Sequence, residues 1–401
     1  RIPSVEIGVK TTWNEIVNAE LRSLDGRLVP SMRMRSLMAT LYRPAPGGRP
    51  NPLQAAKAIY RFVCDNIDPA PAGESAAHIH MDRMGDRNLL LLSMLRAAGL
   101  DAHPAAVRPA MDFMHPPAWK LPKRDVFPVS LVRLNLPGGG SHWLDTRFDS
   151  LPFGKVTDDL SGATAITFMP DGPLFETLPT LPAEESMMIR DKTIRLPGDG
   201  GPLEVSGRSL RRGVAGLLRD QQLTEADAES RRNILLGALY PAFPDAALLS
   251  FEVQHTDENE ASSLERYEAT SRAPIEDRGG GVRAVSLCLQ SPGAISSETR
   301  NLKTRRTACH IKSVQMAEDR NVFHLPENAR FVSLPKPAHI PSRFGVYQLR
   351  VNRRGDDAVE IIRNYHIPAQ RISPWIWPGF LDFLDQVDLA EKQWIEYAVE
   401  E

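Results

Sequence analysis

The sequence predicts an α+β protein of two domains, with a helical segment leading into an antiparallel sheet and a mainly β region after it. Three segments before Gly99 carry helical apolar spacing, short apolar runs follow from Ala102, and the pattern beyond Glu185 is mainly β. At 401 residues the chain exceeds what one hydrophobic core usually serves. We therefore expect one domain over residues 1–180 and a second over 185–401.

The first two helical segments each present one apolar face. In the first, apolar residues recur at three-and-four spacing, at Trp13, Ile16, Val17 and Leu21. The second begins at Asn51–Pro52, because proline at the first helical position loses no hydrogen bond that a helix would use. Its apolar face comprises Leu53, Ala56, Tyr60, Val63 and Cys64.

The third helix, Asn88 to Ala98, is apolar nearly all round and is ended by Gly99. A helix without a polar face is expected in the middle of its domain. Short apolar runs then predict strands over Ala102–Val107 and Phe127–Leu136, with a turn at Pro137–Gly140. A further strand opens at His142, and the domain is expected to close between Phe168 and Glu185.

The second domain is predicted to be mainly β and sandwich-like, with a helical interlude. A hairpin is expected over Met188–Leu196 and Leu203–Ser206. Helices are expected near 208–239, broken near Gln222 with Thr224 as N-cap, and near 378–399. Alternating apolar residues predict strands that close into a sandwich, over 248–255, 282–289, 344–352 and 358–365.

Composition and charge exclude several classes of function. Hydrophobic residues make up 42%, charged residues 24%, and the formal net charge is -2. No sustained basic run indicates nucleic-acid binding, and no apolar run is long enough to span a membrane. Three scattered cysteines, Cys64, Cys288 and Cys309, predict neither a disulfide framework nor a metal site, so we expect no metal and no cofactor. The start at Arg1 instead of methionine suggests a fragment or a processed form.

One motif is similar to a known family. The run Met84–Asn88, followed by the buried helix and Leu95–Ala102, resembles the transglutaminase-like, papain-type domains of bacterial multidomain proteins. In that family a Gly-Asp-Cys-Lys-Asp motif opens a hydrophobic helix that ends in Leu-Arg-Ala-Ala-Gly-Ile. Further segments fit in the family's order, and the last two resemble its following β-rich module: Trp13–Ile16, Ala58–Val63, Phe127–Gly139, Trp143–Asp145, Gly345–Tyr347 and Arg371–Pro374.

The resemblance implies a degenerate catalytic triad. The nucleophilic cysteine falls at Arg87, the histidine at Val129 and the aspartate at Asp145. A guanidinium group is permanently protonated and valine accepts no proton, so neither can replace the thiolate or its base. We therefore expect the family's acyl transfer to be lost, and Arg87→Cys alone to stay inactive.

The sequence leaves several alternatives open for these residues. Cys64 and His142 could form a relocated catalytic pair, although their periodicity assigns Cys64 to an apolar helix face. Arg87 lies at the end of a helix that disfavours cations, so it could form an ion pair with Asp145, point into solvent, or hold an anion.

The function expected is that of a catalytically inactive module that binds a protein or peptide. The alternatives are a cysteine protease or transglutaminase-class enzyme with relocated groups, and a structural subunit of an envelope or secreted assembly. The resemblance favours an extracytoplasmic location. An aromatic cluster near the C-terminus could be an interface, although packing of the last helix explains it as well; it comprises Trp375, Trp377, Phe380 and Phe383.

Overall fold

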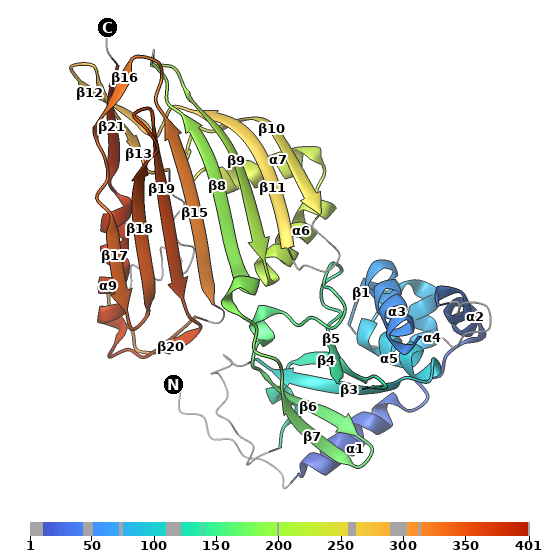
Figure 1. Ribbon diagram of the computed structural model, residues 1–401. Helices are drawn as coiled ribbons and strands as arrows, with labels where there is room; N and C mark the ends of the chain where they lie inside the picture. The colour runs from blue at the N-terminus through green and yellow to red at the C-terminus, as the bar shows by residue number, and fades with distance from the viewer. Residues whose placement is uncertain are drawn as a thin grey trace. The chain divides into compact units, whose positions relative to one another are not determined.

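The computed structural model shows a protein with mixed α and β structure and several sheets (Figure 1). It describes residues 11–42, 51–71, 75–109, 122–138, 140–198, 200–255, 262–288, 303–311 and 314–399. Gly139 and Leu289, which the sequence places in a turn and a strand, lie outside the described residues. The chain divides into two compact units between Leu181 and Pro182, beside the predicted boundary.

The described residues of the first unit form five helices. They are α1 (Trp13–Leu24), α2 (Met32–Leu41), α3 (Pro52–Asn66), α4 (Ala76–Asp82) and α5 (Arg87–Ala97). Side chains of Thr12, Ser31 and Asn51 accept hydrogen bonds from the first turns of α1, α2 and α3. The sequence patterns did not predict α2 or α4.

The first unit also holds an antiparallel sheet of five strands, in the order β5-β4-β3-β6-β7. The strands are β3 (Asp101–Arg108), β4 (Val129–Asn135), β5 (Ser141–Leu144), β6 (Thr164–Met169) and β7 (Gly172–Thr177). Helix α5 packs against α3 and the sheet, and Leu89 to Leu95 are all buried. A short parallel pair, β1 (Asp68–Pro69) and β2 (Met84–Gly85), leads into α5.

The second unit is built on an eight-stranded sheet in the order β10-β11-β9-β8-β15-β19-β18-β17. All neighbours are antiparallel except β8 and β15. The strands are β8 (Met187–Arg195), β9 (Leu203–Arg212), β10 (Ala247–His255), β11 (Ser262–Ser271), β15 (Gln315–His324), β17 (Ala338–Ser342), β18 (Gly345–Arg353) and β19 (Ala358–Ile367).

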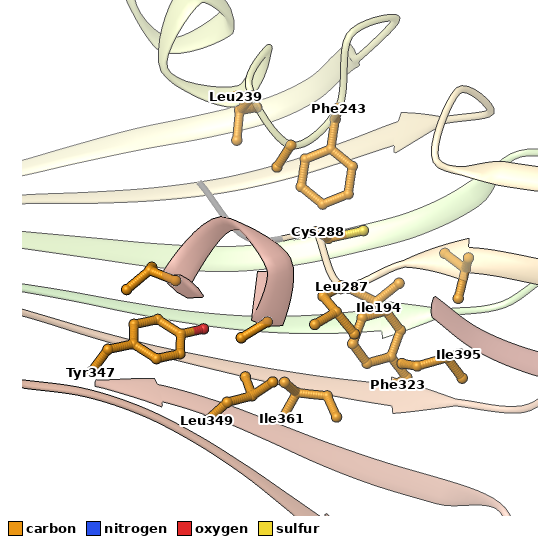
Figure 2. Packing of buried hydrophobic residues seen from close by; sticks show 14 of the residues in the cluster. Ile194, Leu239, Phe243, Leu287, Cys288, Phe323, Tyr347, Leu349, Ile361 and Ile395 are labelled. Carbon is orange, nitrogen blue, oxygen red and sulfur yellow. The ribbon is translucent and has the colours of Figure 1, made fainter. Parts of the chain in front are cut away.

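The second layer of this unit combines helices with a smaller sheet. Helices α6 (Val214–Glu225), α7 (Ala228–Leu239) and α9 (Trp377–Glu391) contact the large sheet. The smaller sheet has the order β12-β13-β21-β16, from strands β12 (Ile275–Gly279), β13 (Val282–Ser286), β21 (Trp394–Val399) and β16 (Ala329–Ser333), while β14 (Cys309–Ile311) pairs with β20 (Gln370–Ile372). Figure 2 shows how side chains of both layers meet in one core, among them Leu239, Phe323, Tyr347 and Ile395.

Several predicted boundaries in the second unit are wrong, and the strand expected over 282–289 ends at Ser286 as β13. Strand β9 continues to Arg212 instead of giving way to helix at 208, and Gly213 (φ +71°) makes the turn into α6. The helices break at Asp227, not near Gln222, because the Asp227 carboxylate accepts the Ser230 N–H and caps α7.

The last helix ends at Glu391, not near 399. Strand β21 follows because Ile395 and Tyr397 are buried while their neighbours are less so, which is the period of a strand. In the part of the chain that the structure describes, no helix has the length and apolarity to cross a membrane.

Candidate functional site

The N-terminus of α5 organises the candidate site. Asp86 is the N-cap, and its carboxylate accepts hydrogen bonds from the backbone N–H groups of Asn88 (2.9 Å) and Leu89 (3.3 Å). Arg87 is therefore the first helical residue, and its side chain is only 5% exposed. The expectation that Arg87 could point into solvent is wrong.

The Arg87 guanidinium connects two separate segments. Its Nε donates to the carbonyl of Ile67 (2.6 Å) and its Nη2 to that of Cys64 (3.0 Å), both at the C-terminal end of α3. Its Nη1 donates to the carbonyl of Thr146 (3.2 Å) and forms an ion pair with Asp149 (2.6 Å). The C-terminal carbonyls of a helix carry partial negative charge, so α3 supplies part of the charge that Arg87 needs.

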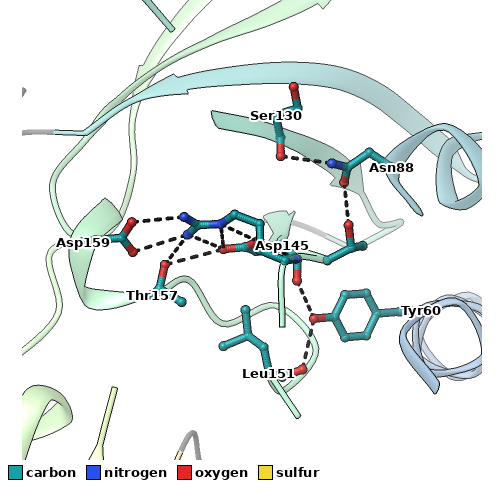
Figure 3. A network of polar contacts seen from close by, with 9 residues as sticks. Tyr60, Asn88, Ser130, Asp145, Leu151, Thr157 and Asp159 are labelled. Carbon is teal, nitrogen blue, oxygen red and sulfur yellow. Dashed lines mark hydrogen bonds and ion pairs between the residues drawn. The ribbon is translucent and has the colours of Figure 1, made fainter. Parts of the chain in front are cut away.

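Asp145 has a different partner from the one expected. The carboxylate is fully buried and accepts hydrogen bonds from Arg147 Nε (3.0 Å) and Nη2 (2.8 Å). Arg147 also donates to Thr157 (2.6 Å) and Asp159 (3.1 Å), as Figure 3 shows. The predicted Arg87–Asp145 ion pair is replaced by the Arg87–Asp149 and Arg147–Asp145 pairs, because each arginine reaches a closer carboxylate on the segment after β5.

The three predicted triad positions nevertheless lie in one neighbourhood. Asn88 Nδ2 donates to the carbonyl of Ser130 (3.1 Å), and Thr146 Oγ1 donates to Asn88 Oδ1 (3.1 Å) (Figure 3). These residues directly follow Arg87, Val129 and Asp145 in the chain. The start of α5, the start of β4 and the end of β5 therefore meet at this point.

Val129 contributes an apolar surface at this site. It opens β4 opposite Val107 of β3 and is half-buried against an apolar cluster that includes Val107 and Leu131. Its isopropyl group offers neither a donor nor an acceptor of protons.

The alternative nucleophile, Cys64, sits in the core. Its side chain is 1% exposed, and burial raises the pKa of its thiol to about 12 even though the positive charge of Arg87 lowers it. His142 is half-buried and packs against the ring of Phe153, 5.5 Å between centroids. At physiological pH the Cys64 thiol is therefore protonated, which makes it a poor nucleophile.

Tyr60 was placed on a helix face by the sequence but not in the site. Its hydroxyl donates to the carbonyls of Asp145 (2.8 Å) and Leu151 (3.0 Å) (Figure 3). Burial raises the pKa of this hydroxyl well above its ordinary value. The partners of Tyr60 and Asp149 lie on other segments, so no local pattern indicates these two residues, whereas Arg147 pairs with Asp145 only two residues before it. Among the described residues no group of three His, Cys, Asp or Glu side chains is placed to hold a metal ion.

Comparisons with known proteins identify related folds. Residues 287–396 match the model of a family described as a domain of unknown function with a solved structure, DUF3858. A crystal structure from Parabacteroides distasonis ATCC 8503, described as that of a "putative protease", aligns with 96% of this chain at 12% identity and a TM-score of 0.52. This chain spans 59% of the length of that protein. No curated protein matched the chain. The chain is thus similar in fold to that structure and contains a segment similar to DUF3858.

Proposed function

We propose that this chain is a catalytically inactive relative of the transglutaminase-like proteins, with a papain-type first unit that serves as a scaffold for binding a protein or peptide. The observation that carries the proposal is the state of Arg87. A buried guanidinium with four polar contacts occupies the position at which a reactive thiolate would have to stand. An arginine held in this way cannot attack an acyl group.

The neighbouring positions support the same conclusion. Val129 stands where the family places the general base, and the Asp145 carboxylate is engaged with Arg147 instead of an imidazole. In the active family members the aspartate at this position orients the catalytic histidine. In this chain Asp145 pairs with Arg147 instead, which gives it a structural role. Two of the three chemical roles are missing, while the contacts that maintain the scaffold are present.

Binding activity is the function that this scaffold can still perform. The solved structure with a similar fold is described as a "putative protease", and a protease-like scaffold without its nucleophile would retain surfaces suited to an extended chain. The second unit, which contains the DUF3858-like segment, would add further surface. The partner proposed is therefore a protein or peptide segment.

Loss of catalysis can be tested with four proteins: wild type, Cys64→Ala, Arg87→Cys and Arg87→Cys/Val129→His. Each is treated with a thiol-reactive activity probe and assayed for amide hydrolysis and acyl transfer. We expect no activity and no native-state labelling in the wild type and in Cys64→Ala. Arg87→Cys alone should add a labelled thiol without turnover, because the base is still missing.

The double variant provides the positive control for the assignment of Arg87 and Val129 to the catalytic positions. Restoring both groups should produce measurable acyl transfer or hydrolysis if Arg87 and Val129 occupy the catalytic positions. Turnover by the wild type that disappears in Cys64→Ala would refute the proposal and favour an enzyme with relocated groups. Co-purification of a stoichiometric partner from the native source would then separate a binding module from a purely structural subunit.

A further inference from the structure

Three basic side chains gather where α2 begins and α4 ends. The imidazole ring of His80 lies 6.1 Å from the ring of Phe62, and the guanidinium of Arg83 lies 5.3 Å from the centroid of the same ring. Burial, then the charge of Arg83 and that of Arg33, lower the pKa of His80. Arg33, at the start of α2, is therefore close enough to His80 for its charge to disfavour protonation of the imidazole.

The positive charge of this cluster is not neutralised within the described residues. Most arginines of the first unit's site are bonded to carboxylates, for example Arg87 to Asp149 and Arg147 to Asp145. In the described ranges neither the Arg33 nor the Arg83 guanidinium forms an ion pair or a hydrogen bond. Arg83 also has a left-handed backbone (φ 58°), which is costly for a residue with a side chain. Asp82 on α4 is an acidic neighbour, but among the described residues it forms no ion pair with either guanidinium, so the two arginines leave positive charge that is suited to an external anion.

An exposed methionine is the sequence neighbour of each of the three basic residues. Met32 is 79% exposed next to Arg33, Met81 is 59% exposed next to His80, and Met84 is 56% exposed next to Arg83. Single exposed apolar residues are ordinary on protein surfaces. Here three exposed methionines each directly neighbour a basic residue in the chain, so exposed apolar and basic side chains are both present at the start of α2 and the end of α4.

We propose that this surface, the Met–Arg patch (Met32, Arg33, His80, Met81, Arg83 and Met84), binds the surface of an anionic lipid bilayer. The guanidinium groups would contact lipid phosphates, and the methionine side chains would enter the boundary between headgroups and acyl chains. A free anion would use only the cations, whereas a bilayer uses the cations and the methionines. The patch comes from two segments far apart in the chain, so a search for basic runs does not detect it.

The test is co-sedimentation of the full chain with vesicles of phosphatidylcholine, with and without phosphatidylglycerol, at low ionic strength. We expect much stronger binding to the anionic vesicles than to the neutral ones. Each arginine near an anionic surface strengthens binding about fivefold, so Arg33→Gln/Arg83→Gln should weaken it about 25-fold. In 0.5 M NaCl the electrostatic part of the binding is largely screened, because the Debye length falls from about 10 Å at 0.1 M salt to about 3 Å at 1 M. Met32→Ser/Met81→Ser should weaken the binding that persists under this condition.

Matched controls carry the same changes elsewhere. Arg195→Gln/Arg353→Gln removes two exposed arginines of the large sheet, and Leu389→Ser removes an apolar side chain that is 73% exposed. Both should bind vesicles like the wild type. Equal binding to neutral and anionic vesicles, or equal losses in the controls, would overturn the proposal. Saturation by inorganic phosphate without vesicle binding would show a free-anion site instead, and capture of an acidic protein without vesicle binding would also reject a membrane partner.

The imidazole provides a second readout. The charged groups that bear on His80 are Arg33 and Arg83, and α4 itself adds His78 and Asp82. Because the pKa of His80 is lowered, its charge appears only below the ordinary range for histidine. Vesicle binding should therefore strengthen as the pH falls from 7 to 5, and His80→Asn should remove a part of that increase. An unchanged pH profile in His80→Asn would exclude His80 from the patch.

Discussion

Arg87→Ala is the change that probes the structural role of the arginine most directly. The substitution removes three hydrogen bonds to backbone carbonyls and leaves Asp149 without its cation. Hydrogen bonds from charged donors contribute about 1.5–3 kcal/mol each, and a buried carbonyl that is left without its donor costs about 1–3 kcal/mol. Because contacts of one side chain are not additive, we expect a loss of about 3–5 kcal/mol in the stability of the first unit.

A comparison with Asp149→Ala separates the carbonyl contacts from the ion pair. The Asp149 side chain is 59% exposed, so solvent screens its pair with Arg87 and its loss should cost only about 0–1 kcal/mol. Arg87→Lys keeps the charge but cannot reach three divergent carbonyls, so it should resemble alanine more than the wild type.

Hydrogen exchange followed by mass spectrometry measures this effect locally. Peptides from α3 and α5 should exchange faster in Arg87→Ala, while peptides from the eight-stranded sheet serve as an internal control. Arg35→Ala, which removes an exposed arginine of α2, is the matched control and should change little. An Asp149→Ala effect as large as that of Arg87→Ala would refute the reasoning, as would a loss below about 1 kcal/mol in Arg87→Ala.

Other predictions concern the second unit and can be measured by urea unfolding. Gly207→Ala should cost about 1–3 kcal/mol, because its Cβ would lie 2.5 Å from the Tyr267 hydroxyl oxygen. Gly237→Ala, with nothing within 4 Å on a helix, should stabilise by about 0.5–1 kcal/mol, and equal effects would contradict this contrast. Burial lowers the pKa of Lys192 from 10.5 to about 8. Between pH 8 and 10.5 the Lys192 side chain is therefore protonated in the unfolded chain and neutral in the folded protein. The stability of the wild type relative to Lys192→Met should rise by about 3 kcal/mol over this pH range. A flat difference would show that Lys192 titrates normally. Arg363→Met should cost about 3–5 kcal/mol, because the buried Asp319 keeps only Arg190 and the half-buried Glu391 loses its arginine partner; a loss below about 1 kcal/mol would contradict that role.

Local patterns in the sequence determined much of the first unit. The all-round apolar run from Asn88 predicts a buried helix, and Leu89 to Leu95 are buried in α5. The strand signals that start at Ala102, Phe127 and His142 correspond to β3, β4 and β5, with boundaries shifted by one or two residues. These features follow from side-chain period and turn chemistry, which neighbouring residues specify.

Boundaries in the second unit depended on competition between local and tertiary preferences. The residues after Ser206 suit a helix by pattern, yet pairing of β9 with β8 and β11 extends the strand to Arg212. Similarly, the apolar spacing of residues 394–399 continues the pattern of the last helix, but these residues form β21, which pairs with β13 and β16. Pairing with neighbours on both sides outweighs a weak local propensity.

The sequence by itself determined which residue types occupy the candidate site, and only the tertiary structure decided their partners. That Arg87 and Val129 cannot perform nucleophilic and basic roles follows from their chemistry alone. That Arg87 pairs with Asp149 depends on how the segment after β5 passes the end of α3, whereas Asp145 pairs with Arg147, two residues later on its own segment. When an arginine pairs with a carboxylate on a distant segment, differences of a few ångströms in their separation determine the partner. Coulomb attraction and hydrogen-bond geometry favour the nearest well-oriented carboxylate. No spacing along the chain carries that information.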